Sequence, residues 1–139
     1  MILTFGDRYN ILTTLIGTAL GFSNDKIHIV TSSNAEKSLI IDLFKACLGS
    51  AEYKEITPNE FEFSQGSKII FYSVFNPEGA KGVLRDYLYI VNTELFKQDI
   101  INELVRRTKI KTYVDSNFFK LDPLSGLDDQ LVISVNHKA

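Results

Sequence analysis

The sequence predicts an α/β fold with one largely parallel β-sheet, helices on both faces of the sheet and one β-hairpin. Short apolar runs at residues 2–5, 26–31, 87–91 and 111–115 are typical of buried strands. Longer stretches between several of these runs carry apolar residues at helical spacing. Strands that alternate with helices favour a parallel sheet, because each helix returns the chain to the edge where the next strand begins.

The first half of the chain is expected to form strand, helix, strand and helix. The first strand, residues 2–5, ends at Gly6, and the helix behind it covers residues 10–20 and stops at Gly21. After the strand at residues 26–31, Ser33 and Glu36 have the spacing of a capping box, which predicts a second helix that ends at Gly49. Its expected apolar face is Leu39, Ile40, Leu43, Phe44 and Cys47.

The second half begins with the expected hairpin. Residues 61–64 alternate apolar and polar side chains, a turn follows at residues 65–67, and residues 68–74 are strongly strand-forming. Residues 76–82 and 122–129 are expected to be loops, residues 87–91 a central strand and residues 96–107 a helix. Strands are expected again at residues 111–115 and 131–135.

Composition excludes several classes of function. The 139 residues fit one domain, residues 1–139, and 45% hydrophobic content supports a real core. A net charge of -2 gives no support for a strongly basic nucleic-acid surface. With one cysteine, Cys47, and no Cys/His cluster at ligand spacing, we expect no metal site. No apolar run approaches the roughly 20 residues of a membrane span, so we expect no membrane partner and a reducing, intracellular setting.

The segment at residues 6–13 joins a strand to a helix, which is the place of a phosphate-binding P-loop. The P-loop pattern is Gly, four residues, Gly, Lys, then Ser or Thr. Gly6 and Thr13 fit it, but Ile11 stands at the second glycine position and Leu12 at the lysine position. By itself this match is weak, and the segment taken alone favours an ordinary strand-to-helix turn.

A longer pattern follows between residues 82 and 117. An Arg-Asp pair at 85–86 precedes the apolar strand, an Arg-Thr pair at 107–108 follows the next helix, and a strand then ends at Asp115 and Asn117. This order and spacing resemble the Walker B region of phage terminase large subunits. The resemblance places Val91 at the position of the metal-linked acid and Asn92 at that of the catalytic glutamate, with Glu94 as a candidate substitute if the strand shifts by two residues.

The resemblance extends to the first motif and to the hairpin, where the segment from Gly66 to Ile70 resembles the family's Gly-Ser-Arg/Lys-Ile strand. Terminases often carry an arginine two residues after the first glycine, and Arg8 stands there. The degenerate nucleotide-binding positions are therefore Gly6, Arg8, Ile11, Leu12 and Thr13. Asp115 and Asn117 match the family's downstream coupling motif, although Phe118 replaces its proline.

The resemblance implies a P-loop NTPase-like domain related to phage DNA packaging, without a nuclease domain. Leucine for lysine and valine for the acid remove phosphate and metal contacts, and Asn92 cannot act as a base at neutral pH. The sequence therefore favours, without deciding, a catalytically inactive module with no cofactor. Its expected partners are proteins of phage packaging or virion assembly, and its expected location is the host cytoplasm or the virion.

Two alternatives stay open at this point. One is an active ATPase fragment of a packaging motor, which uses ATP and Mg²⁺ with Arg8 and Glu94 as substitutes. The other is an accessory DNA-binding protein without enzymatic activity, whose binding would depend strongly on salt concentration.

Overall fold

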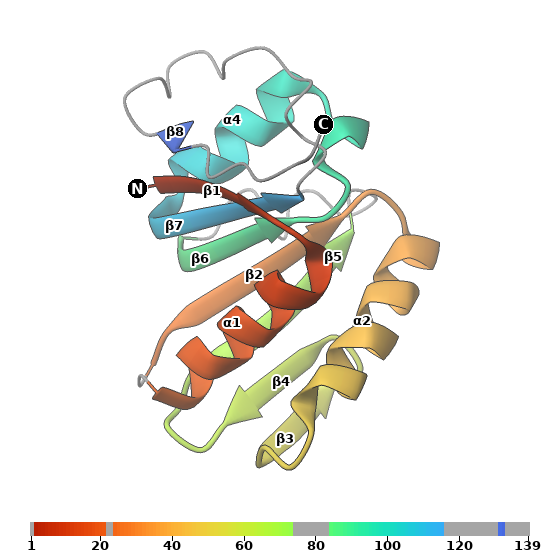
Figure 1. The fold of residues 1–139 in the computed structure, drawn as a ribbon, viewed down its shortest axis with the longest axis vertical. Coiled ribbons are helices and arrows are strands. Elements are labelled where there is room, and N and C mark those ends of the chain that lie inside the picture. Colours follow the sequence, from red (N-terminus) through yellow and green to blue (C-terminus); the bar gives the residue numbers. More distant parts are fainter. Residues whose placement is uncertain (1, 22–23, 74–83, 116–130, 133–139) are drawn as a thin grey trace.

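The structure is a computed structural model, and it describes residues 2–21, 24–73, 84–115 and 131–132 (Figure 1). These residues form one eight-stranded sheet in the order β3-β4-β5-β2-β6-β7-β1-β8. The strands are β1 (Ile2–Gly6), β2 (Lys26–Thr31), β3 (Tyr53–Thr57), β4 (Glu60–Phe63), β5 (Lys68–Ser73), β6 (Arg85–Ile90), β7 (Thr108–Asp115) and β8 (Leu131–Val132). The helices are α1 (Arg8–Gly21), α2 (Asn34–Leu48), α4 (Gln98–Arg106) and a short 3-10 helix η1 (Thr93–Leu95).

The sheet is mixed and largely parallel, as predicted. β5, β2, β6, β7, β1 and β8 pair in parallel, while β4 pairs antiparallel with both β3 and β5. The predicted hairpin is thus confirmed as β4–β5, with Phe61 opposite Ile69. Sequence analysis missed β3, because every residue of this edge strand is exposed and its side chains give no apolar alternation.

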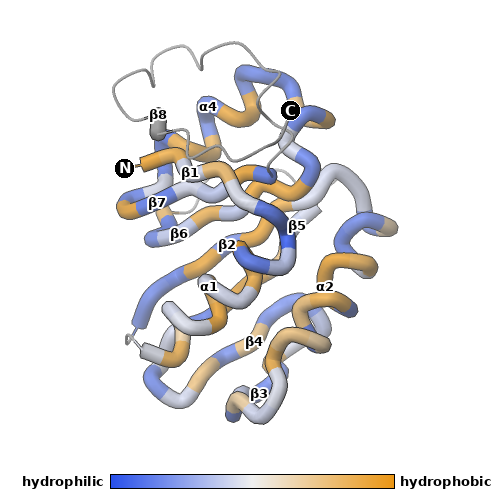
Figure 2. Tube along the Cα trace, viewed as in Figure 1, coloured by the Kyte–Doolittle hydropathy of each residue, from blue (hydrophilic) through white to orange (hydrophobic). Residues whose placement is uncertain are grey.

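Helices cover both faces of the sheet. On β2, Ile27 and Ile29 pack into the cluster formed with α1 and α2, whereas Val30 packs into the cluster formed with α4. Figure 2 shows hydrophobic and hydrophilic stretches that alternate along α2 and α4, as expected for helices with one face on a sheet. Among the described helices, none has the length and apolar character needed to cross a membrane.

The expected apolar face of α2 needs one correction. Ile40, Phe44 and Leu48 are buried at a spacing of four residues, but Leu39 is 66% exposed. One residue corresponds to about 100° of helical rotation, so Leu39 turns away from the stripe that Ile40 defines. Ser33 caps the helix by accepting from the Glu36 amide at 3.1 Å, as predicted.

A buried polar network explains the Arg-Asp and Arg-Thr pairs structurally. The Arg85 guanidinium, 1% exposed, donates to the Leu104 carbonyl at 2.7 Å, to the Thr108 hydroxyl at 3.4 Å and to His28 Nδ1 at 2.9 Å. The Asp86 carboxylate accepts from the Lys26 amide at 2.8 Å and so fixes the start of β2. These residues connect the strands and close the end of α4.

Burial sets the protonation of this network. Desolvation, helped by the Arg85 and Lys26 charges, lowers the pKa of His28 to about 3, so the ring is neutral at physiological pH. Because Nδ1 accepts from Arg85, the proton lies on Nε2, which has no hydrogen-bond partner among the described residues. Burial also lowers the pKa of Arg85, to about 10, so the guanidinium stays charged.

Candidate functional site

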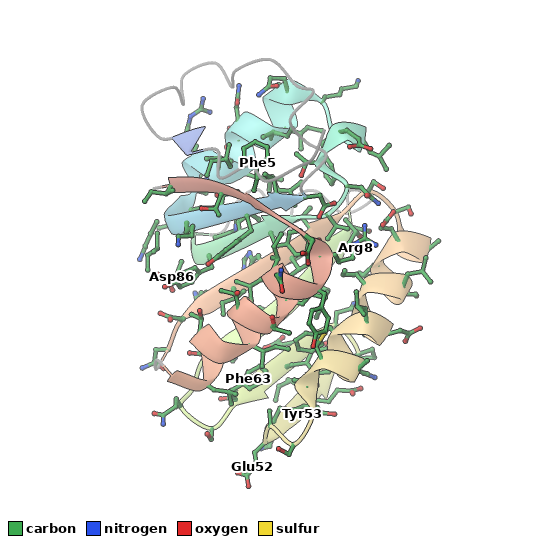
Figure 3. The ribbon with its side chains drawn as sticks, viewed as in Figure 1. Phe5, Arg8, Glu52, Tyr53, Phe63 and Asp86 are labelled. Atoms are coloured by element: carbon green, nitrogen blue, oxygen red, sulfur yellow. The ribbon has the colours of Figure 1, made fainter. Side chains whose placement is uncertain are left out.

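The carboxyl ends of three parallel strands, β1, β7 and β6, meet at one edge of the sheet. Gly6 at the end of β1 lies opposite Asp115 at the end of β7, and Asn92 follows β6 by two residues. Ligands of open α/β sheets bind outside this edge. Figure 3 shows Arg8 at the same edge, where the start of α1 faces the start of α2.

The turn between β1 and α1 consists of Asp7 alone, because the helix begins at Arg8 rather than at the expected Asn10. The Asp7 carboxylate accepts from the Asn10 amide and from the Asn10 side chain, each at 2.8 Å. The Asp7 carbonyl accepts from the Ile11 amide at 2.9 Å. The Asn10 amide, which could meet a phosphate at this helix end, is therefore directed at an internal carboxylate.

The other predicted positions in this segment belong to the helix and its core contacts. Ile11 and Leu12 are 3% and 0% exposed, and both pack into the cluster under α1 and α2. The Thr13 hydroxyl donates to the Asn10 carbonyl at 3.1 Å. A Cβ on Gly6 would lie 3.3 Å from Ile11 Cγ1, so a larger residue at this position would crowd the Ile11 side chain.

Arg8 reaches from α1 toward three other segments. Its guanidinium donates to Asn92 Oδ1 at 3.1 Å. It also lies 3.7 Å from the Glu36 carboxylate and 3.9 Å from the Asp115 carboxylate. One cation thus faces two anions and one amide oxygen, which come from α2, from β7 and from the residue before η1.

Asn92 uses both polar groups of its side chain and its backbone amide in this cluster. Its side-chain oxygen accepts from Arg8, its side-chain nitrogen donates to Glu36 at 2.6 Å, and its backbone amide donates to the Asp115 carboxylate. The residue adopts a left-handed conformation with φ of 53°. Asparagine tolerates this region better than most residues that carry a side chain.

Asp115 is the most deeply buried acid of the cluster. Burial raises its pKa above the ordinary value, and three interactions oppose that rise: the Tyr89 hydroxyl, the Asn92 amide and the Arg8 charge. The Tyr89 hydroxyl donates to Asp115 at 2.6 Å. Burial and the adjacent carboxylate raise the pKa of Tyr89 as well, so its proton stays in place to donate.

The remaining predicted residues do not join the cluster. Val91 is 0% exposed, packs under α1 and α2, and donates its amide to the Val30 carbonyl at 2.9 Å. Glu94 is exposed in η1, and Asn117 lies outside the described residues. Within the described part of the chain, no group of three or more His, Cys, Asp or Glu side chains could hold a metal ion.

Sequence reasoning missed two members of the cluster. Glu36 was expected to close the capping box on Ser33, but its carboxylate binds Asn92 and faces Arg8 instead. Tyr89 was expected only to be part of a buried strand. Neither partner is near in sequence, since Glu36 and Asn92 are 56 residues apart, so no local pattern could reveal the contacts.

Comparisons with known proteins identify the fold. No family model matches the sequence, and no curated protein matches it. The structure is similar to the large terminase of a thermophilic bacteriophage, with a TM-score of 0.68 and 16% identity over 95% of this chain and 39% of the other. The HK97 bacteriophage large terminase gives a TM-score of 0.68 and 11% identity, over 96% of this chain and 35% of the other.

A third similar structure is the ATPase domain of the Thermus phage P74-26 large terminase. It gives a TM-score of 0.56 and 8% identity, and the match covers 83% of this chain and 58% of that domain. The chain thus spans little more than a third of the two whole terminases above. At these identities the likeness concerns the backbone: this chain has the fold of a phage large terminase ATPase domain.

Proposed function

We propose that this chain is a catalytically silent relative of the terminase ATPase domain that serves as a binding or structural module in phage DNA packaging. The single observation that supports it best is the β1–α1 turn. One residue, Asp7, joins β1 to α1 where a phosphate loop would stand, and its carboxylate accepts from the Asn10 backbone amide. A second anion at this position would meet a negative charge within hydrogen-bond distance of the same amide.

The chemistry of hydrolysis supports the same proposal. Phosphoryl transfer needs a cation on the phosphates, a metal held by an acid and a carboxylate that orients water. Leu12 and Val91 supply none of these, and Asn92 directs both ends of its amide to internal partners. Loss of charge stabilisation and of the water-orienting group slows a reaction by many powers of ten, at about 1.4 kcal/mol for each.

The partners in this proposal are proteins of a packaging or virion assembly, in the cytoplasm of a phage-infected cell or in the particle. The terminase fold motivates the setting, and a net charge of -2 ranks proteins above DNA as partners. A gel shift across salt concentrations separates the two, since binding through phosphates weakens steeply with salt.

A thermal-shift titration with Mg-ATP tests the inactive module directly. We expect no saturable change in Tm, with MgCl₂ alone as the control for ionic effects. A ligand that binds the native state stabilises it by about 2.7 kcal/mol at a concentration of 100 times Kd, so binding would be visible. Saturable stabilisation by Mg-ATP, but not by MgCl₂, would overturn the proposal.

One observation favours the active alternative. Two carboxylates, Glu36 and Asp115, and one cation, Arg8, do lie at the edge where a nucleotide would bind. Turnover of ATP with DNA present, abolished by Glu36→Gln or Glu94→Gln, would establish that function. The absence of turnover under those conditions would discard it.

A further inference from the structure

Asn92 connects three segments that are far apart in the sequence. Its partner Arg8 is 84 residues away at the start of α1, Glu36 is 56 residues away in the first turn of α2, and Asp115 is 23 residues away at the end of β7. A donor and an acceptor on one short side chain are both needed, because Arg8 only donates and Glu36 only accepts.

The backbone at Asn92 supplies an independent constraint. With φ of 53°, this position disfavours residues with longer side chains, including the glutamate that stands there in active relatives of this fold according to the sequence resemblance. A non-glycine residue stays in this conformation only when its surroundings hold it there. The surroundings here are the three hydrogen bonds to Arg8, Glu36 and Asp115.

We propose that Arg8, Glu36, Asn92 and Asp115 form a latch that fixes the starts of α1 and α2 against the ends of β6 and β7 without any ligand, with Asn92 as its central positioning residue. The latch deepens the proposed function, because it does internally what a bound ligand does at this edge of a sheet. In this proposal Asn92 has a positioning role of its own and is not merely a replacement for a catalytic glutamate.

Burial and charge balance indicate that the four residues act together. The side chains of Arg8, Glu36 and Asp115 are 35%, 16% and 8% exposed, so water screens the carboxylates much less than the cation. Without Arg8, the two carboxylates would retain, among the described residues, only neutral donors from Asn92 and Tyr89. Loss of one member should therefore weaken contacts made by the others, which defines a coupled unit.

Hydrogen exchange of the Asn92 backbone amide reports whether the latch is intact. The Asn92 amide donates to the Asp115 side chain, whereas the neighbouring Val91 amide donates to the Val30 carbonyl within the sheet. In Arg8→Ala we expect exchange at Asn92 to rise about tenfold or more while exchange at Val91 stays unchanged, because only the latch opens. Arg8→Lys, which keeps the charge but loses the planar fork, should give a smaller rise.

The matched control is Arg106→Ala, which removes an exposed ion pair with Glu103 on α4 and should leave both amides unaffected. A double-mutant cycle of Arg8→Ala with Glu36→Gln gives the second readout. Their effects on the Asn92 exchange rate should be non-additive, with the double variant exchanging less than the product of the two single fold-changes predicts.

Equal exchange at Asn92 in the wild type and Arg8→Ala, or strictly multiplicative effects in the cycle, would overturn the latch. If a variant fails to fold, the conservative Arg8→Lys and Glu36→Gln variants carry the same comparison. All these measurements are made without nucleotide. Binding of Mg-ATP to the wild type would therefore contradict the proposed function and leave the latch result standing. Unchanged exchange at Asn92 in Arg8→Ala, without Mg-ATP binding to the wild type, would contradict the latch and leave the proposed function standing.

Discussion

Two arginines occupy opposite environments in this molecule, and both stand in the motifs that sequence analysis singled out. Arg85 is fully buried, and its hydrogen bonds described above go to neutral acceptors on His28, Leu104 and Thr108. Arg8 is partly exposed and faces two carboxylates and an amide oxygen. The first arrangement is a structural support of the fold, whereas the second occupies the place of a ligand site.

The comparison shows that matching a motif does not fix what its residues do. The Arg-Asp and Arg-Thr pairs, which carry the sequence resemblance, contribute Asp86, Arg85 and Thr108 to contacts that assemble β2, β6 and α4. Positions that would serve chemistry, Leu12 and Val91, are core residues in this chain. Arg85, Asp86 and Thr108 thus have structural roles in this fold, and the predictions below test the difference between such residues and those at the edge of the sheet.

The largest effect is expected for Arg85→Met. The change leaves the Leu104 carbonyl, the Thr108 hydroxyl and His28 Nδ1 without their shared donor in a buried site. The Leu104 carbonyl still accepts from the Thr108 hydroxyl at 3.0 Å, so His28 Nδ1 is the group that loses its partner. At about 1.5–3 kcal/mol for each hydrogen bond from a charged donor, we expect a loss of about 5 kcal/mol, enough to unfold a marginal domain. Urea unfolding followed by circular dichroism measures it, and a loss no larger than that of Arg106→Ala would contradict the structural role.

The second effect is the acid sensitivity caused by His28. Its pKa falls from 6.5 in the unfolded chain to about 3 in the fold, so the unfolded state binds the proton more readily as the pH drops. The associated stability is fully present above pH 6.5 and is lost progressively as the pH falls toward 3, in total on the order of 5 kcal/mol at about 1.4 kcal/mol per pH unit.

His28→Gln isolates this contribution, because the glutamine oxygen can still accept from Arg85 but does not titrate. The free energy of unfolding of that variant should depend less on pH between 6.5 and 4 than that of the wild type. The same substitution at the other histidine, His137, serves as the control. Parallel pH profiles for wild type and His28→Gln would exclude a buried, neutral His28.

A third and smaller effect is expected for Asn92→Glu, which introduces the residue that the sequence resemblance places at this position in terminases. The new side chain disfavours the left-handed backbone and adds a third carboxylate beside Glu36 and Asp115. We expect a loss of about 2 kcal/mol in stability and no ATPase activity. Glu94→Gln, a change at an exposed position, should stay within about 0.5 kcal/mol; gained turnover in Asn92→Glu would count against the inactive module.

The smallest effect is expected for Leu39→Ser. Since this side chain is 66% exposed, its removal should change stability by less than about 0.5 kcal/mol. Ile40→Ala, one residue further and 1% exposed, should lose about 2–5 kcal/mol. Thermal unfolding of the pair checks the orientation of α2, and similar losses for both would show that the helix is rotated relative to the structure.

The sequence by itself determined most of the secondary structure elements and the class of the sheet. Apolar runs, helical spacing and turn residues are local signals, and they predicted β1, β2, the β4–β5 hairpin, β6 and β7 to within a few residues. The sequence resemblance assigned Arg8, Asn92 and Asp115 to three separate motifs, and the structure brings these residues into contact.

Only the tertiary structure decided what that place contains. The strand order puts β7 between β1 and β6, and so it brings Asp115 between Arg8 and Asn92. The position of α2 directs the Glu36 carboxylate to Asn92 instead of to the Ser33 end of its own helix. Residues 53–57 form strand β3 because they pair with β4. These outcomes depend on contacts between residues far apart in the chain, where the free energy of hydrogen bonding and burial overrides local preference.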